Sequence, residues 1–457
     1  MHFLSNLPRW LLLYFTILGD FMNIYYITFG CKVNLYETEN MKQRFSERGH
    51  SAVPSETEAD AFLINSCTVT EGSDKKLKKE IRRLKRSYPE AVIILTGCFP
   101  QAFADKAAEL YEADIVAGTK DRADLPDLLS RFLADRQRIV NVRSYQRNEA
   151  FESMANTGYD NNTRAFVKIQ DGCNMFCSYC IIPYSRGGFR SKPLGDIVSE
   201  VTALAAAGYR EVVLTGINLS FYGVDFSLRL ADAVEAVCGV EGIERVRLGS
   251  IEPEVISAED VKRFAVQKKL CPQFHLSLQS GCDKTLKAMN RRYSSADYEN
   301  IVNLLRTNFE NCSVTTDIMV GFPGETDEDF STSLKFAEKI GFAKAHIFQY
   351  SRRKGTPAAE MEGQVPEAVK RSRAAKMAEA MEKRREAFLQ SQVGTVAPVL
   401  FEREKSDGFP HGYTPNYTQV KISKKNHNIS LRNRIFYVKI IGLDKDRCLG
   451  EILYEGE

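Results

Sequence analysis

The chain has 457 residues, of which 44% are hydrophobic and 26% are charged, a composition typical of a globular protein of about three domains. It excludes a disordered tail, a fibre and a single small module. Lys and Arg number 62 against 59 Asp and Glu, which leaves a net charge of +3, so any surface for nucleic acid has to be local.

Residues 1–22 are expected to be an extension outside the folded domains, with Met22 as the natural start. They contain an apolar run over residues 11–18, which is far shorter than the ~20 residues of a membrane span. A signal peptide is the alternative, but no small-residue cleavage pattern precedes the first predicted strand. We therefore expect no contact with a membrane.

Residues 23–135 alternate apolar strands with amphipathic helices, which predicts a doubly wound parallel sheet. Cys31, Cys67 and Cys98 each follow the carboxyl end of a predicted strand, and such sheets bind ligands at that edge. The pattern predicts that the three thiols meet at one point, whereas separate structural cysteines are the alternative. The predicted strands are 24–29, 61–65, 92–96 and 114–117, and the predicted helices are 34–48, 75–86, 101–110 and 125–132.

A polar linker is predicted over residues 136–163, and a second alternating domain over residues 164–390. Six strands favour an open, partial barrel of six strand–helix units, because a closed barrel of this kind needs eight. The long helix 366–392 completes this domain, and residues 391–457 alternate as a small all-β barrel does. The six strands centre on 166–169, 212–214, 246–248, 275–278, 315–319 and 346–348.

Cys173, Cys177 and Cys180 form a CxxxCxxC pattern in the loop after the first barrel strand. Three thiolates on one short loop suit three irons of a [4Fe-4S] cluster and leave the fourth iron open for a ligand. Zinc is the competing metal, but its structural sites take four ligands, and none of the six His residues is near this loop. Eleven cysteines are few for a disulfide scaffold, so we expect a reducing, cytoplasmic compartment.

Together these motifs resemble the methylthiotransferases of the radical S-adenosylmethionine superfamily. The resemblance runs from residue 23 to the end of the chain and covers all three predicted domains. It is carried by residues 30–34 (GCKVN), 65–68 (NSCT), 96–98 (TGC), 173–180 (CNMFCSYC), 180–183 (CIIP), 275–281 (HLSLQSG) and 320–326 (VGFPGET).

This resemblance implies an enzyme with two [4Fe-4S] clusters and S-adenosylmethionine as cofactors. The open iron of the Cys173/Cys177/Cys180 cluster would bind S-adenosylmethionine and deliver an electron, releasing a deoxyadenosyl radical. An auxiliary cluster on the other three cysteines would hold the sulfur that is transferred, and a second S-adenosylmethionine would supply the methyl group. The implied partners are an electron donor of the flavodoxin or ferredoxin type and a sulfur donor.

The resemblance also implies residues that face S-adenosylmethionine at the carboxyl ends of the barrel strands. Each has a simpler alternative: burial for the ring, a turn for the glycines, and solvation for the polar side chains. The implied residues are Tyr179, Gly216, Ser250, Glu252, Gln279 and Gly321.

The carboxyl-terminal β-barrel resembles the small TRAM-like RNA-binding barrel that methylthiotransferases append, through residues 401–402 and 412–417. Tyr413 and Tyr417 are predicted to stack on RNA bases, and a β domain whose charge is merely solvated is the less favoured alternative. Residues 75–86 form the densest basic run, for which phosphate contact and a solvated helix face are both open. The predicted basic face of the barrel consists of Lys421, Lys424, Lys425, Arg432, Arg434 and Lys439.

Three substrates compete within the family: N6-threonylcarbamoyladenosine in tRNA, isopentenyl-adenosine in tRNA, and an aspartate of a ribosomal protein. The GCKVN (30–34) and TGIN (215–218) segments differ from the family's patterns for the second and third substrates. We therefore expect methylthiolation at C2 of threonylcarbamoyladenosine beside the anticodon (position 37). Lys32, Arg186 and Arg190 are the cations predicted to meet its carboxylate, unless they are solvated or bind phosphate. A non-catalytic iron–sulfur RNA-binding protein is the alternative from another class.

Overall fold

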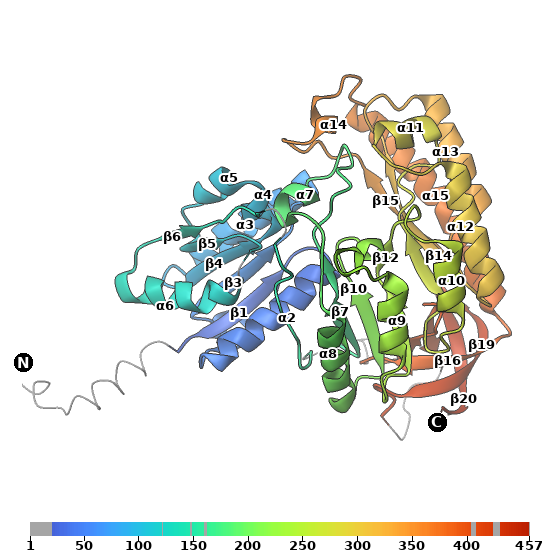
Figure 1. Cartoon of the computed structure of the whole chain (residues 1–457), viewed down its shortest axis with the longest axis horizontal. Coiled ribbons are helices and arrows are strands. Elements are labelled where there is room, and N and C mark those ends of the chain that lie inside the picture. Colours follow the sequence, from blue (N-terminus) through green and yellow to red (C-terminus); the bar gives the residue numbers. More distant parts are fainter. Residues whose placement is uncertain are drawn as a thin grey trace, which may run out of the picture. The chain divides into compact units, whose positions relative to one another are not determined.

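A parallel sheet of six strands forms the centre of the first of two units into which the computed structural model divides (Figure 1). This unit comprises Met1–Met154 and Ile181–Gly188, and the second unit comprises Ala155–Cys180 and Phe189–Glu457. The structure describes residues 21–120, 122–146, 149–159, 162–403, 408–423 and 430–456. The predicted extension up to residue 20, together with Lys424 and Lys425, lies outside the described residues.

The strand order of the first sheet is β2-β1-β3-β4-β5-β6, and every pair is parallel. All four predicted strands are present, and β3 and β4 are buried along their whole length, as parallel strands covered on both faces are. The sixth strand lies inside the predicted linker. The strands are β1 (Asn23–Thr28), β2 (Ser51–Ala52), β3 (Ala61–Ser66), β4 (Val92–Gly97), β5 (Ile115–Ala117) and β6 (Ile139–Asn141).

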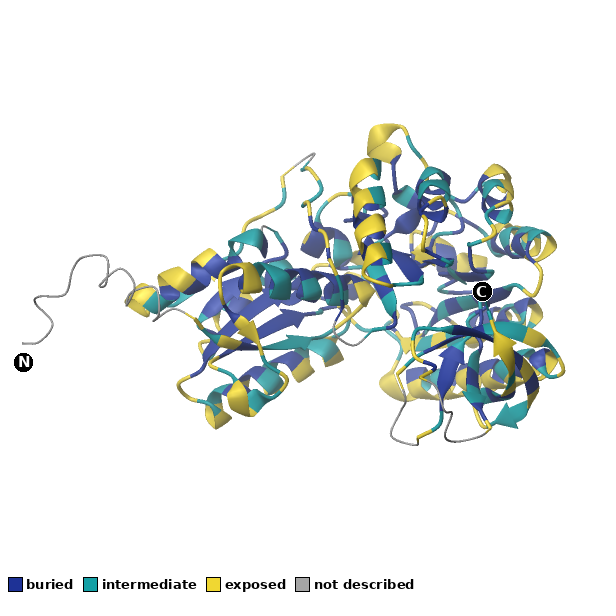
Figure 2. Cartoon of the chain, turned by 90° about the horizontal axis from the view of Figure 1, so that it is seen from below, coloured by how far each residue is buried: buried dark blue, intermediate teal, exposed yellow. Residues whose placement is uncertain are grey.

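Helices cover both faces of this sheet, which confirms the doubly wound architecture. Helices α2 (Lys32–Glu47) and α6 (Leu125–Asp135) pack on one face, while α3 (Glu71–Ser87), α4 (Cys98–Ala102) and α5 (Ala104–Ala108) pack on the other. The single helix expected over 101–110 is interrupted, because Phe103 leaves the helical conformation between α4 and α5. Buried residues, dark blue in Figure 2, are concentrated in the strands.

The wall of the second unit contains all six predicted strands and a short additional strand, β12. Its seven strands form two parallel sheets of order β11-β10-β7 and β12-β13-β14-β15, and in the described residues β15 pairs with β14 alone. The barrel is therefore partial, as predicted. The strands are β7 (Arg164–Lys168), β10 (Glu211–Thr215), β11 (Arg245–Leu248), β12 (Ser250–Ile251), β13 (Gln273–Leu276), β14 (Ser313–Val320) and β15 (Lys344–Gln349). A hairpin of β8 (Gln170–Asp171) and β9 (Arg190–Ser191) follows β7.

Several helices of this unit begin at a reciprocal capping box. In α10, α12 and α13 a Ser or Thr side chain accepts from the backbone N–H three residues ahead, and an Asp at that position accepts from the cap residue. The predicted long helix is α15. The helices are α8 (Leu194–Ala206), α9 (Leu230–Cys238), α10 (Ala258–Ala265), α11 (Asp283–Ala288), α12 (Ser295–Asn308), α13 (Asp327–Ile340), α14 (Pro357–Glu360) and α15 (Glu367–Gln392). Within the described ranges, every helix is too short or too polar to cross a bilayer.

The carboxyl-terminal strands close into a barrel of order β16-β17-β18-β20-β19, which confirms the predicted all-β domain. Its core contains Val399, Phe401, Val420 and Val438. The strands are β16 (Val396–Phe401), β17 (His411–Tyr413), β18 (Gln419–Ile422), β19 (Ile435–Asp444) and β20 (Arg447–Glu455).

Three arginines of β7 and β11 fasten this barrel to the rest of the second unit. Arg245 donates to the carbonyl oxygens of Tyr413 (2.9 Å) and Pro398 (2.9 Å), and Arg247 donates to that of Pro415 (2.9 Å). Arg164 donates to the Tyr417 hydroxyl (2.6 Å) and to Glu402 (2.7 Å). The turn over residues 413–417 is thus held by the buried Arg245 and Arg247 and by the half-buried Arg164.

Candidate functional site

Cys31, Cys67 and Cys98 stand at the carboxyl edge of the first sheet. Cys31 caps the amino end of α2, Cys67 directly follows β3, and Cys98 is the first residue of α4 after β4. Burial raises the pKa of the Cys67 thiol to about 11, and the neighbouring Cys98 and Cys31 thiols contribute to this rise. The structure thus brings together three thiols that are far apart in sequence.

Two glycines make room at this edge. Gly30 has φ +116°, and a Cβ there would lie 2.8 Å from Cβ of Cys67. Gly97 has φ +102°, and a Cβ there would lie 2.4 Å from the Ser66 carbonyl oxygen. A larger residue at either position would strain the backbone and fill the space beside the thiols.

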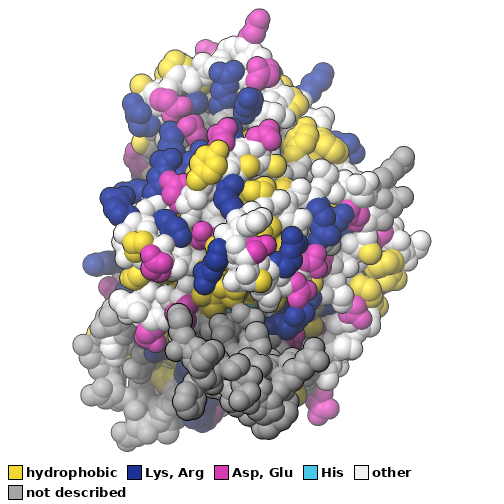
Figure 3. Space-filling model, turned by 90° about the vertical axis from the view of Figure 1, so that its left-hand side faces the viewer, with side chains coloured by type: hydrophobic (Ala, Val, Ile, Leu, Met, Phe, Trp, Pro, Cys, Tyr) yellow, Lys and Arg dark blue, Asp and Glu magenta, His cyan; other side chains and the backbone are white. Residues whose placement is uncertain are grey.

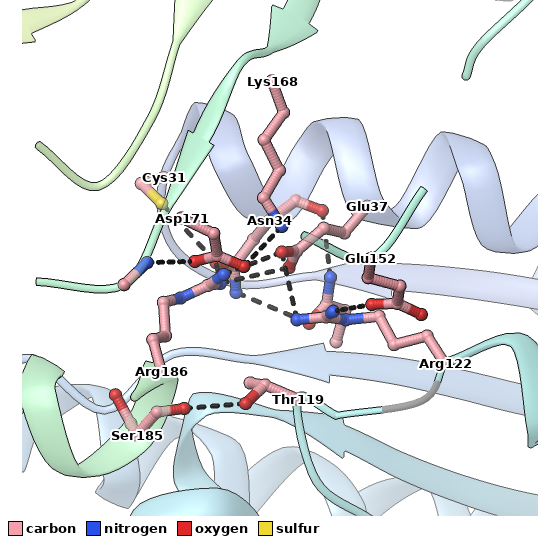
Figure 4. A network of polar contacts seen from close by, with 12 residues as sticks. Cys31, Asn34, Glu37, Thr119, Arg122, Glu152, Lys168, Asp171, Ser185 and Arg186 are labelled. Carbon is pink, nitrogen blue, oxygen red and sulfur yellow. Dashed lines mark hydrogen bonds and ion pairs between the residues drawn. The ribbon is translucent and has the colours of Figure 1, made fainter. Parts of the chain in front are cut away.

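A buried polar network that includes Asn34 and Arg186 lies beside Cys31 (Figure 4). Asn34 donates to the carbonyl oxygens of Phe29 (3.0 Å) and Ser66 (3.0 Å), and its Oδ1 accepts from Arg186 (2.9 Å). Burial raises the pKa of the Cys98 thiol, whereas the charge of Arg186 and a hydrogen bond from it lower that pKa. Arg186 therefore presents a positive charge to one of the thiols.

The CxxxCxxC loop of the second unit leaves β8 and is fixed by backbone contacts. Gly172 and Phe176 adopt positive φ angles of 70° and 48°. Ser178 donates its backbone N–H to the Met289 carbonyl oxygen (3.0 Å), and the Cys180 N–H donates to that of Cys177 (2.9 Å). Two left-handed residues thus fold three cysteines into one tight loop.

Two side chains donate to the thiols of this loop. Asn218 Nδ2 lies 3.9 Å from Sγ of Cys173, and Arg291 Nη1 lies 3.4 Å from Sγ of Cys177. Burial raises the pKa of the Cys173 thiol to about 11 and also raises that of Cys177, while these two donors oppose the shift. Such donors stabilise thiolates, which is the form that binds metal.

Each set of cysteines has space or hydrogen-bond donors beside its thiols. Among the described residues, no three His, Cys, Asp or Glu side chains are close enough together to hold one ion. In a [4Fe-4S] cubane each thiolate binds a different iron, so its ligands stand farther apart. The thiols of the first sheet have two glycines beside them, and the thiols of the CxxxCxxC loop have two N–H donors. Both surroundings are suitable for an iron–sulfur cluster.

The chain is similar to known proteins over most of its length. Residues 167–337 match the radical SAM superfamily, and residues 23–118 match a family described as "Uncharacterized protein family UPF0004". The threonylcarbamoyladenosine tRNA methylthiotransferase MtaB of Aquifex aeolicus is 36% identical over 88% of this chain and 96% of its own. MtaB of Thermotoga maritima is 38% identical over 86% and 89%. The tRNA-2-methylthio-N6-dimethylallyladenosine synthase of Caldicellulosiruptor saccharolyticus is 34% identical over 93% and 92%.

The chain belongs to the radical S-adenosylmethionine tRNA methylthiotransferases. A solved radical S-adenosylmethionine methyltransferase, TsrM from Kitasatospora setae, has a TM-score of 0.54 with 74% of each chain covered, and at 14% identity it supports the fold alone. As a member of this superfamily, the methylthiotransferase uses a [4Fe-4S] cluster and S-adenosylmethionine. The superfamily match includes the CxxxCxxC loop.

The predicted cofactor residues of the methylthiotransferase lie where the barrel strands end. Gln279, just beyond β13, has φ +64° and exchanges backbone hydrogen bonds with β14, a strained conformation of the kind found at functional sites. Ser250 is exposed at the start of β12, and Glu252 pairs with Arg291. Their contact with S-adenosylmethionine stays a prediction.

At three other predicted positions, packing alone explains the residue type that is present. The Tyr179 ring packs against a group of buried apolar side chains that contains Met289 and Phe322. A Cβ at Gly216 would lie 2.9 Å from the side chain of Gln170, and one at Gly321, which has φ +72°, would lie 2.4 Å from that of Lys370. These reasons coexist with a role toward the cofactor, which stays a prediction.

The cations predicted to meet the substrate differ in exposure. Lys32 is exposed at the start of α2, but Arg186 is fully buried and paired with Glu37 (2.7 Å). Arg190 is also buried, and it pairs with Asp171 (3.1 Å), which precedes the CxxxCxxC loop. Arg186 and Arg190 thus hold elements next to the cysteines in place, and their direct contact with substrate stays a prediction.

Tyr413 and Tyr417 stack on each other, with ring centroids 4.7 Å apart. The Arg164 guanidinium lies over both rings (4.8 and 5.0 Å), and that of Arg247 lies over Tyr417 (4.5 Å). Because arginines and the partner ring already lie against these rings, they differ from the open stacking platforms expected from the sequence. Their role in RNA binding stays a prediction.

The basic residues expected to face RNA are partly neutralised. In the barrel, Lys421 pairs with Asp444 and Arg434 pairs with Glu455, whereas Arg432 and Lys439 are exposed. In α3, four of the cations pair with nearby carboxylates. On the face drawn in Figure 3, lysine and arginine side chains are interspersed with aspartate and glutamate. A solvated helix face is the better interpretation of residues 75–86.

Sequence reasoning missed three residues beside the cysteines. Asn34 and Asn218 lie inside the GCKVN and TGIN motifs, so their position next to cysteines or cofactor residues was a usable signal. Arg291 follows α11 in an ordinary basic pair of residues, and nothing in the sequence connects it with Cys177, which is 114 positions away.

Proposed function

We propose that this methylthiotransferase adds a methylthio group to C2 of N6-threonylcarbamoyladenosine at position 37 of tRNA. The observation that carries the proposal is similarity: three relatives named for threonylcarbamoyladenosine are 36–38% identical over 86–88% of the chain. Relatives named for dimethylallyladenosine are 32–36% identical. Dimethylallyladenosine is therefore the second candidate substrate.

We further propose that Cys31, Cys67 and Cys98 hold an auxiliary [4Fe-4S] cluster. The gathering of the three thiols, the space beside Gly30 and Gly97, and the charge of Arg186 all support it. Cys173, Cys177 and Cys180 would hold the cluster that, when bound, supplies the reductive cleavage of S-adenosylmethionine. The auxiliary cluster would be the site of the sulfur that is transferred.

The protein's own residues would bind and orient these groups. Asn218 and Arg291 would donate hydrogen bonds to the thiolates of the CxxxCxxC loop, and Arg190 would hold Asp171 at the base of that loop. Arg186 would compensate the charge of the auxiliary thiolates. An electron donor of the flavodoxin or ferredoxin type, a sulfur donor and a cytoplasmic location complete the proposal.

The experiment compares two tRNA substrates with reconstituted enzyme under reducing, anaerobic conditions. One tRNA carries threonylcarbamoyladenosine and the other carries isopentenyl-adenosine, and nucleosides are analysed by mass spectrometry. We expect methylthiolation of the first and little of the second, because a site that binds a carboxylate leaves its donors unpaired without one. Comparable rates, or modification of a ribosomal protein only, would contradict the substrate. Absence of S-adenosylmethionine cleavage after reduction would favour a non-catalytic iron–sulfur protein.

A further inference from the structure

Strands β13, β14 and β15 have one face covered by helices and one face without them. Thr316 and Leu276 contact α12 through the Tyr298 hydroxyl (3.4 and 3.0 Å), which identifies the covered face. Along β14, Val314, Thr316, Ile318 and Val320 are buried, whereas the alternate residues Thr315, Asp317 and Met319 are partly exposed. In Figure 1, α12 and α13 lie to the right of β15. The alternate residues therefore face the opposite side, which in a barrel is the interior.

Register places further side chains on this uncovered face. Thr315 pairs with Lys344, and Asp317 pairs with His346. On the other side of β14, His275 pairs with Thr315. Because paired residues of neighbouring strands point to the same face, Lys344, His346 and His275 share the face of Asp317.

Four side chains on this face form a connected polar group, and Lys344 shares the face by register. His275 Nδ1 lies 3.0 Å from the Thr315 hydroxyl, and its Nε2 lies 3.3 Å from Asp317. The rings of His275 and His346 have centroids 6.1 Å apart. Lys344 and His346 are exposed. Asp317 and Thr315 thus fix the imidazole of His275, while the edge strand β15 adds a lysine and a second histidine.

Such a group is unusual in this place. The interior of a strand–helix barrel is normally filled by branched apolar side chains, whereas this group is polar and is exposed at Lys344 and His346. The polar group also lies next to the predicted cofactor edge, because the backbone N–H of Gln279 donates to the carbonyl oxygen of Asp317 (2.8 Å). None of its side chains takes part in the contacts described for the two sets of cysteines.

We infer that Lys344, His346 and His275 form the subsite for the threonylcarbamoyl group, an inference that rests on the proposed substrate. Lys344 and His346 donate to the carboxylate. Both ring nitrogens of His275 already face Thr315 and Asp317, so His275 is a positioning residue beside the His346 ring. An isopentenyl chain offers none of these partners. A phosphate of the anticodon loop has anion chemistry in common with the carboxylate, so the test has to separate the two.

The test measures tRNA binding to the reconstituted holoenzyme, with and without the threonylcarbamoyl group on an otherwise identical tRNA. The native enzyme is expected to prefer the modified tRNA by roughly tenfold or more, the scale of charge-assisted hydrogen bonds. Lys344→Ala and His346→Ala should abolish this preference without changing affinity for the unmodified tRNA. Lys344→Arg should retain part of it. Lys339→Ala, on α13 and paired with Glu299 (2.7 Å), is the matched control.

Two kinds of result overturn the inference. If the alanine variants lose the same affinity for both tRNAs, these side chains bind a phosphate of the tRNA. If both alanine variants keep the native preference for the modified tRNA, these side chains do not contact the threonylcarbamoyl group. Thermal unfolding of each variant separates these results from misfolding, and Lys344→Arg together with His346→Asn provides milder changes. If the native enzyme methylthiolates isopentenyl-adenosine instead, the proposed function fails, whereas failure of the variants alone leaves that function intact.

Discussion

Arg186 and Glu37 form a fully buried ion pair between residues 149 positions apart, with Arg186 Nη1 2.7 Å from Glu37 Oε1. Arg122 pairs with the same Glu37 oxygen (3.0 Å) and with Glu152 (2.8 Å). One carboxylate thus faces two buried guanidinium groups. Removing either partner of a buried pair leaves an uncompensated buried charge. The resulting loss in the free energy of unfolding exceeds the net stabilisation that the intact pair provides.

Replacing Arg186 should therefore affect both stability and iron content. We expect Arg186→Ala to lower the free energy of unfolding by about 3 kcal/mol and to reduce iron at the auxiliary site, because the Cys98 thiol loses its positive neighbour. Denaturant unfolding and iron analysis after reconstitution measure the two effects. Arg210→Ala is the control, since its pair with Glu244 is one-third exposed and is worth less than about 1 kcal/mol. Equal effects of the two substitutions would contradict the prediction.

Changing one cysteine of the proposed auxiliary site should reduce the iron content by about half, the share of one of two cubanes. Reconstituted enzyme is expected to hold about eight irons, as two cubanes require, and Cys67→Ser should remove about half while reductive cleavage of S-adenosylmethionine stays measurable. Cys177→Ser should abolish that cleavage. Cys312→Ser, a half-buried cysteine outside both sets, should change neither. If Cys67→Ser abolishes cleavage as completely as Cys177→Ser, the proposed division between the clusters is wrong.

Glu211 should make the stability of the second unit depend on pH. Burial alone would raise the pKa of this carboxyl, but Arg247, Arg245 and Arg164 outweigh burial, so the pKa is lowered. A lowered pKa in the folded state stabilises the fold above the unfolded value of about 4.3, and this stabilisation is lost as the pH falls through the folded pKa. The native protein should therefore lose stability on acidification.

The variant that tests this is Glu211→Gln, which leaves the buried Arg245 and Arg247 without their carboxylate. We expect a loss of about 3 kcal/mol at pH 7 and a weaker pH dependence than in the native protein, measured by denaturant unfolding from pH 7 down to about pH 2, because the loss falls below the unfolded pKa of about 4.3. Glu379→Gln, at an exposed pair on α15, serves as the control. Parallel pH profiles for Glu211→Gln and the native protein would refute the assignment.

Exposed cations of the carboxyl-terminal barrel should contribute to tRNA binding. We expect Arg432→Ala combined with Lys439→Ala to weaken binding and to reduce the slope of log affinity against log salt by about two, one for each phosphate that the protein no longer neutralises. Removing Gln392–Glu457 should also weaken binding, but it would expose the arginines that fasten the barrel, so point substitutions are cleaner. Lys383→Ala on α15 is the control, and filter binding over a range of salt concentrations is the measurement. An unchanged slope in the double variant would contradict an RNA-binding role for this face.

The sequence predicted the elements whose signal is local. Every expected strand is present because apolar runs between polar turns mark buried strands, and Cys31, Cys67 and Cys98 could be placed at one edge because parallel strands end together. Strand β6 escaped prediction, since three residues at a sheet edge, none of them buried, carry little pattern. The Arg291–Cys177 contact and the stacking of Tyr413 on Tyr417 under Arg164 depend on long-range packing, for which spacing gives no signal.

The path of the chain has a consequence for modularity. Cys180 belongs to the second unit, and the very next residue, Ile181, begins a segment of eight residues that folds with the first unit and carries Arg186. No single cut divides the protein into two self-sufficient halves. A fragment starting at residue 155 would carry a guanidinium whose carboxylate had been left behind, and one ending at residue 154 would leave Glu37 without Arg186. A domain exchange between relatives would therefore have to transfer two stretches of chain: the first unit up to residue 154, and the segment 181–188 within the second unit.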